Sequence, residues 1–182
     1  AYFAEPNLMP LIAITAARLS IRRGLSPSSP YSFAVSGFVL SGALAMYEQG
    51  YRYGEVAQQM AGRYGESDQA HAMFVFNVFL RHLKEPWPQV VDHLAQGWRR
   101  SLASGDQEDA TYNGGVLFQC HFLTGRPLAV DLTYPEVADY LRRVRMPHVG
   151  PGFDAWLELL RAVSSEAMPG ELKGELFDYA AQ

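Results

Sequence analysis

Three polar side chains recur at helical spacing within an otherwise apolar and aromatic stretch, namely Asn77, Arg81 and Lys84. Their i, i+4, i+7 spacing places them on one face of a helix. Such a stripe could contact a peptide or a small ligand, and Tyr112 and Asn113 on the next such helix are candidate neighbours. Every surface helix also needs a solvated face, and we favour that simpler interpretation of the stripe.

Histidine and cysteine offer little further chemistry. The single cysteine, Cys120, excludes a disulfide framework and a cysteine-based zinc site. Neighbouring side chains point about 100° apart on a helix, so Cys120 and His121 make a poor chelate. No His-x-x-x-His pair, Gly-x-Ser-x-Gly elbow, phosphate loop or dinucleotide fingerprint occurs. We therefore expect no enzyme activity, no catalytic residue, no cofactor and no metal.

Composition excludes several further classes of protein. With 48% hydrophobic and 19% charged residues in 182, the chain can bury a core and is not disordered. A net charge of −4 argues against nucleic acid as a partner. No charged residue lies between Leu25 and Tyr47, but serines, glycines and prolines interrupt this stretch, so we expect no membrane span. The chain begins at Ala1 without an initiator methionine or signal-like segment, from which we expect a piece of a longer cytoplasmic protein.

Glycine-containing breaks recur at a nearly constant distance. Gly24, Gly65 and Gly105 follow one another at a period of about 40 residues, and one further period leads to Arg145. Such a period is typical of stacked helix pairs, and glycine suits the left-handed position after a helix. We therefore predict an all-α fold, an α-solenoid of antiparallel helix pairs with a repeat of about 40 residues. The expected segments are a helix over 7–23, repeats over 25–65, 66–105 and 106–145, and a partial repeat over 146–182.

Each repeat divides near its middle into an outgoing and a returning helix. The dividing signals are Gln49-Gly50, Glu85-Pro86 and the segment 124–127. The predicted outgoing helices cover residues 31–48, 70–84 and 110–123, with a fourth over 153–163 and a weak segment over 171–181. Asp106 is a good cap for the third, and a Thr133–Glu136 capping box starts the third returning helix late.

The expected returning helices carry matching apolar stripes at i, i+3, i+4, i+7. The three sets are Tyr53, Val56, Ala57, Met60; then Val91, Leu94, Ala95, Trp98; then Val137, Tyr140, Leu141, Val144. Glycine inside a helix costs about 1 kcal/mol relative to alanine, so we expect close helix approach to compensate. The glycines concerned are Gly37, Gly42, Gly97, Gly114 and Gly115.

Three segments follow one another in order: 50–57 (GYRYGEVA), 76–85 (FNVFLRHLKE) and 105–112 (GDQEDATY). In order and spacing they resemble the tetratricopeptide-like repeat region of large bacterial signalling proteins. Those proteins join a serine/threonine kinase-like domain, a signal-transduction ATPase, the repeats, and often a GAF domain with a histidine kinase. One departure is Leu83, where the family tends to have Trp. Another is the repeat length, because the standard tetratricopeptide unit is shorter.

The resemblance implies a tetratricopeptide-like solenoid with a non-catalytic role. The chain would be a scaffold or regulatory segment of a bacterial signal-transduction ATPase or kinase, contacting other domains of the parent protein or partner proteins. An effector-sensing module that binds a small molecule or peptide in the concave groove is the alternative. In helix-pair solenoids the outgoing helices commonly line that concave surface.

Overall fold

The computed structural model describes residues 5, 7–64, 66–124, 134–144, 155, 156 and 159. Every regular element among these residues is a helix, which confirms the all-α prediction. In chain order the elements are α1 (Leu8–Arg23), α2 (Ser29–Leu44), α3 (Tyr47–Ala61), α4 (Glu66–Phe79), the 3₁₀ turn η1 (Arg81–Leu83), α5 (Trp87–Ser104), α6 (Gln107–Phe122) and α8 (Pro135–Arg143).

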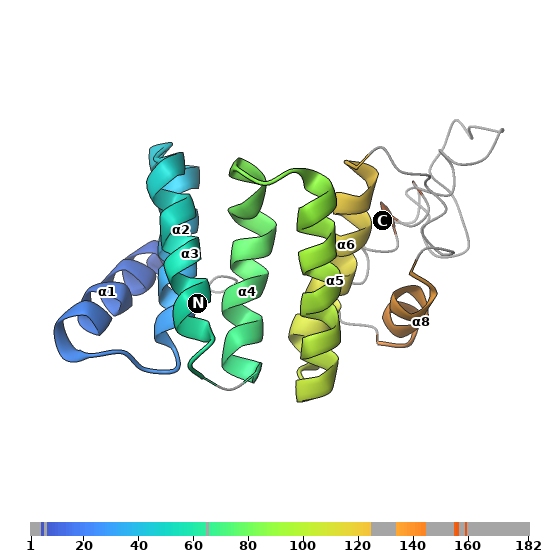
Figure 1. Cartoon of the computed structure of the whole chain (residues 1–182), viewed down its shortest axis with the longest axis horizontal. Helices are drawn as coiled ribbons and strands as arrows, with labels where there is room; N and C mark the ends of the chain where they lie inside the picture. Colours follow the sequence, from blue (N-terminus) through green and yellow to red (C-terminus); the bar gives the residue numbers. More distant parts are fainter. Residues whose placement is uncertain are drawn as a thin grey trace.

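Helices α2 to α6 stand side by side, and successive helices run in opposite directions (Figure 1). Each contacts its neighbour in the chain, and α4 also contacts α2 and α6, which are two helices away in sequence. The outgoing helices α2, α4 and α6 therefore contact one another in order, while α1 packs on α2 and α8 packs on α6.

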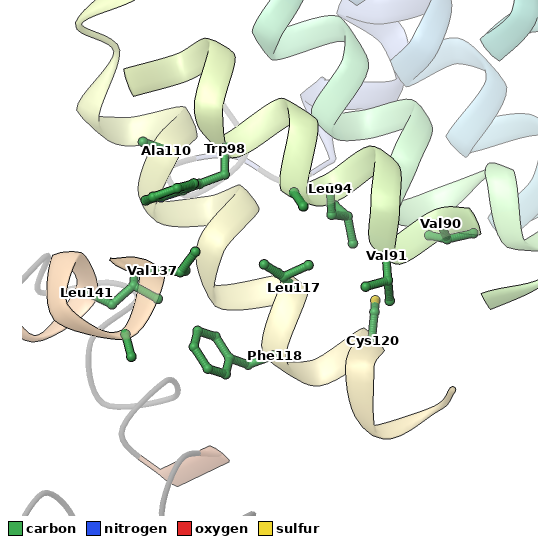
Figure 2. Close-up of a cluster of buried hydrophobic side chains, with 12 residues drawn as sticks. Val90, Val91, Leu94, Trp98, Ala110, Leu117, Phe118, Cys120, Val137 and Leu141 are labelled. Atoms are coloured by element: carbon green, nitrogen blue, oxygen red, sulfur yellow. The ribbon is translucent and has the colours of Figure 1, made fainter. Parts of the chain in front are cut away.

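The apolar stripe of α5 lies in the largest described core cluster, as the sequence predicts. Val91, Leu94, Ala95 and Trp98 are all buried. In Figure 2 Leu94 of α5 lies near Leu117 of α6. Trp98 of α5 and Val137 and Leu141 of α8 all come close to Gly114 of α6. Burying a leucine or valine side chain contributes about 1.5–3 kcal/mol, so this stripe anchors α5 to α6.

The stripes predicted for the other two returning helices are buried only in part. On α3, Ala57 and Met60 are buried and Tyr53 is half-buried, but Val56 is 39% exposed, so the prediction is wrong there. In the stripe predicted for α8, the first and third residues are buried and the other two are half-buried, and the last, Val144, lies just after the helix. The helix period therefore predicts which face of each helix is buried, but not how wide that buried face is.

The break predicted at Gln49-Gly50 is wrong. Helix α2 ends earlier, at Leu44, and the chain turns at Ala45, whose φ of 53° is left-handed. Gly50 lies inside α3, where a Cβ atom would come 2.7 Å from the carbonyl oxygen of Gly37. This glycine is present because it lets α3 cross α2 at close range.

The helix predicted over 70–84 begins earlier and also ends earlier. Helix α4 stops at Phe79, and Leu80 leaves the helical region with φ −126° before the η1 turn. Pro86 disfavours helical backbone at Glu85, so a continuous helix could not have run into α5. Arg81 therefore lies in η1 and not on the helix that carries Asn77.

Two of the predicted glycine breaks are confirmed by their backbone angles. Gly24 has φ 103° and Gly105 has φ 76°, both in the left-handed range that favours glycine, whereas Gly65 lies outside the described residues. Asp106 caps α6 as predicted, accepting a hydrogen bond of 3.0 Å from the backbone N–H of Asp109. Helix α6 spans 107–122 and not 110–123. The segment 171–181 and Thr133 lie outside the described residues, as does most of 153–163.

The predicted close approach at helical glycines is confirmed at three positions. A Cβ at Gly37 would lie 2.6 Å from a backbone oxygen, at Gly97 2.6 Å from Asn113 Oδ1, and at Gly114 3.0 Å from a methyl group of Val137. Gly42 is different, because a Cβ there would meet only an ordinary contact at 3.7 Å.

Helix α2 covers most of the uncharged stretch and is buried by its neighbours α1, α3 and α4. Two of its serines bond back to the helix backbone: Ser32 Oγ donates to the carbonyl oxygen of Ser28 at 3.1 Å, and Ser36 Oγ to that of Ser32 at 2.7 Å. In the described part of the chain, none of the helices has both the length and the apolar character needed to cross a bilayer.

Candidate functional site

Asn77 and Arg81 lie together, but both are buried. Arg81 is 5% exposed and donates through Nε to Asn77 Oδ1 at 2.6 Å, through Nη1 to Glu85 at 2.7 Å and through Nη2 to Gln58 at 3.0 Å. We call these four residues the Arg81 cluster. The guanidinium of Arg81 also lies 4.3 Å from the ring centroid of Phe76, a cation–π contact.

Glu85 of the Arg81 cluster holds two further groups. The hydroxyl of Tyr51 donates to Glu85 Oε1 at 2.8 Å, and Nε2 of His93 lies 3.5 Å from Oε2. Burial, followed by the bond to Glu85, raises the pKa of Tyr51 to about 12. Burial, followed by the charge of Arg81, lowers the pKa of His93.

The Arg81 cluster joins four elements, since its partners come from α3, α4, η1 and α5. A hollow of about 90 Å³ adjoins Asn77 and Arg81. All three guanidinium nitrogens already bond to protein groups, so the arrangement acts as a structural tie between helices. Ligand binding by Asn77 and Arg81 stays a prediction.

Lys84 and Asn113 lie apart from this pair. Lys84 is exposed, with Nζ 2.6 Å from a carboxylate oxygen of Glu48 and 5.3 Å from the ring centroid of Tyr51. Asn113 is fully buried on α6 opposite Gly97, and its Nδ2 donates to a backbone oxygen of the same helix at 2.9 Å. The three-residue stripe therefore does not form one surface.

Tyr112, the remaining predicted residue, lines a different and larger hollow of about 350 Å³. The lining side chains come from α1 and from the three outgoing helices α2, α4 and α6. We call it the aromatic hollow. Its apolar lining residues are Met9, Val35, Phe38, Phe74, Val75 and Phe79.

Polar lining residues of the aromatic hollow gather around one hydrogen bond. Nδ1 of His71 donates to Oδ2 of Asp109 at 2.7 Å, and the ring of Tyr31 meets that of His71 edge-on with centroids 5.3 Å apart. The bond to Asp109 is the main cause that raises the pKa of His71. The other polar lining residues are Glu108 and Tyr112.

One group beside the aromatic hollow has donor atoms of the types that bind metals. Atoms of His71, Asp106 and Asp109 that could serve as ligands lie within 4.8 Å of one another. An imidazole with two carboxylates suits several divalent cations. In this structure, however, Asp106 caps α6 and Asp109 accepts the hydrogen bond from His71, so these donors already serve the fold.

The polar stripe predicted from the sequence does not line the aromatic hollow. The residues that do line it could have been found in the sequence, because several of them recur about 40 residues apart. Tyr31, His71 and Tyr112 follow one another at one repeat period, and all three line the hollow. Phe38 and Phe79, which also lie one period apart, do the same. These lining residues come from α2, α4 and α6, which contact one another in order.

The comparisons with known proteins give one weak similarity to a signalling protein. Hybrid signal transduction histidine kinase G of Dictyostelium discoideum is 24% identical to this chain over 161 residues, which make up 87% of this chain. The chain spans about 5% of the length of that curated relative. The relative comes from a eukaryote, so a bacterial origin stays a prediction. No family model and no solved structure matches the chain.

Proposed function

We propose that the chain is a tetratricopeptide-like α-solenoid segment that serves a signalling protein as a non-catalytic scaffold. In this proposal it belongs to a multidomain signal-transduction ATPase or kinase, of the bacterial kind that its sequence resembles. It contacts other domains of that protein or a partner protein. The similarity to one-twentieth of a much larger hybrid histidine kinase supports a role as one segment among several.

The helix contacts support the solenoid part of the proposal. Helices α2, α4 and α6 contact one another in order, α3 packs on α2 and α4, and α5 packs on α4 and α6. In a solenoid each unit contacts only its neighbours, so curvature changes by small rotations that add along the stack. Such a segment can transmit a contact at one end to a domain at the other.

The observation that carries the scaffold role is that α1 has apolar side chains on two opposite faces, one buried and one exposed. Its buried face, with Ala13 and Ala17, packs against α2. Leu8, Leu11, Ile12 and Leu19 lie on the opposite side at helical spacing and are 44–63% exposed. We call these four the α1 stripe. Leu8, Leu11 and Ile12 are neighbours at i, i+3, i+4, and Leu19 follows two turns further along the same face. Large aliphatic side chains exposed along one helix face are typical of a protein contact surface.

Cross-linking in the purified complete gene product tests this role. Benzoylphenylalanine placed at Leu11, in the α1 stripe, is expected to cross-link to residues outside 1–182, mapped by mass spectrometry. The matched control is the same group at Gln59, an exposed position on the returning helix α3. Equal cross-linking yields outside 1–182 from the two positions would refute the scaffold role.

Effector sensing is a second candidate function, favoured by the aromatic hollow. Four helices contribute to the lining of this hollow, so an occupant would touch α1, α2, α4 and α6 at once. A ligand that prefers one relative placement of these helices would shift the population of solenoid curvatures. The two functions are compatible, because a scaffold that changes curvature can report on the ligand.

A further inference from the structure

The aromatic hollow has two chemically different ends. Phe38 and Phe79 form the apolar end, with ring centroids 4.6 Å apart. Tyr31 and His71 meet at the other end, beside Asp109. Along α2 the two ends are two helical turns apart, or roughly 10 Å at about 1.5 Å per residue. A ligand that satisfies both ends is amphipathic.

Carboxylates dominate the charge at the polar end. Asp109 is buried and Glu108 is exposed in the first turn of α6, and Asp106 caps the same helix. His71 is the facing cation when protonated, and within the described chain Glu108 makes no ion pair. Three acids therefore face one imidazole, and this end of the hollow is complementary to a positive charge.

Aromatic rings beside these acids add to the same preference. Phe74 and Tyr112 lie with ring centroids 5.4 Å apart, and Tyr31 stands across from them on α2. A cation over an aromatic face gains about 0.5–2 kcal/mol. Burial, followed by the charges of Asp109 and Glu108, raises the pKa of Tyr31, and burial with the same two acids raises that of Tyr112.

We infer that the aromatic hollow binds a small organic cation, a protonated amine carried on an apolar, ring-sized body. The ammonium group lies near Glu108 between the tyrosine rings, and the body packs against Phe38 and Phe79. A hollow of about 350 Å³ falls within the range of small-molecule sites, roughly 300–1,000 Å³. An anion of the same size would face the carboxylates of α6 and is rejected. This inference rests on the second candidate function.

Two indole compounds with the same two-carbon spacer and opposite charges test the charge preference directly. Tryptamine has an ethylammonium group on the ring, and indole-3-propionate has the matching carboxylate. We expect tryptamine to bind the chain more than about tenfold more tightly in calorimetric titrations at low salt with EDTA present. Chemical shift changes of the amides of α2, α4 and α6 would place it in the hollow.

Two variants locate the interaction. Glu108→Gln, at an exposed position, is expected to weaken tryptamine binding about threefold, the size typical of an exposed ion pair. Glu136→Gln removes another exposed acid, on α8 and outside the hollow, and is expected to leave the affinity unchanged. Thermal melts of both variants establish that they fold.

Three outcomes would overturn the inference. They are equal binding of the two indoles, no effect of Glu108→Gln, and tighter binding of a capped lysine tripeptide than of tryptamine, which would assign the hollow to a partner peptide. None of these outcomes bears on cross-links from the α1 stripe. Failure of the cation site and failure of the scaffold role are therefore distinguishable.

Discussion

His71 on α4 donates a hydrogen bond of 2.7 Å to Asp109 on α6, and this bond ties the second outgoing helix to the third beside the aromatic hollow. The carboxylate is 1% exposed while the imidazole is about half exposed. A buried carboxylate needs such a partner, because an unpaired charge away from water is costly. The pair therefore links the stability of the stack to the protonation of one histidine.

Stability is expected to fall as pH rises through the titration of His71. The folded protein holds the pKa of His71 above its ordinary value of 6.5. The contribution is thus fully present below pH 6.5 and is lost as pH rises through the raised folded pKa. Urea unfolding of the wild type and of His71→Gln, from mildly acidic to mildly alkaline pH, measures it as the difference between the two curves.

His82 and His93 titrate in the opposite sense, since burial lowers their pKa values. Both remain in wild type and variant, so their effect cancels in the difference. Asp109→Asn should remove the same pH dependence as His71→Gln. Parallel stability curves for wild type and His71→Gln would show that the bond does not contribute in solution.

Removal of Arg81 is expected to destabilise the fold strongly. Arg81→Met leaves Glu85 with little solvent and without its main cation, for which the expected loss is about 3–5 kcal/mol of unfolding free energy. The matched control is Lys84→Met, which breaks the exposed pair with Glu48 and should destabilise the fold much less, because solvent screens that pair. Urea titrations followed by circular dichroism give both values. Similar losses in the two variants would contradict the tie between helices.

Alanine substitutions at two glycines of α2 are expected to act in opposite directions. Gly37→Ala places a Cβ 2.6 Å from the backbone oxygen of Gly50, so the helices must move apart at a cost of about 1–3 kcal/mol. Gly42→Ala meets nothing closer than 3.7 Å and gains up to about 1 kcal/mol from helix propensity. Melting temperatures of the two variants, one lowered and one raised, check this. A rise for both would mean that α2 and α3 do not cross at Gly37.

Cys120 is expected to resist alkylation in the folded protein. It is buried, and burial raises the pKa of its thiol to about 11, so the reactive thiolate is scarce near neutral pH. Iodoacetamide at mildly alkaline pH should modify it rapidly in urea and slowly without urea, as followed by mass spectrometry. Equal rates in the two conditions would place the thiol at the surface.

Features that depend on a few neighbouring residues were predictable from the sequence. The all-α character, the left-handed glycines at 24 and 105, the Asp106 cap and the buried stripe of α5 all follow from local backbone preference or from one helix period. The break predicted at Gly50 was wrong because glycine serves both turns and close helix crossings. Only the position of Gly37 on another helix distinguishes the two.

The candidate site depended on tertiary structure. Spacing within the helix predicted over 70–84 placed Asn77 and Arg81 on one side, but spacing could not tell whether that side met water or other helices, nor that α4 ends before Arg81. Likewise, the sequence alone determined that helices alternate with turns about every 20 residues, because helix periodicity and glycine φ preferences are local. Which side chains meet across those helices was decided only by how the helices rotate and cross. That is why His71 and Asp109, far apart in the chain, are joined by a hydrogen bond beside the aromatic hollow.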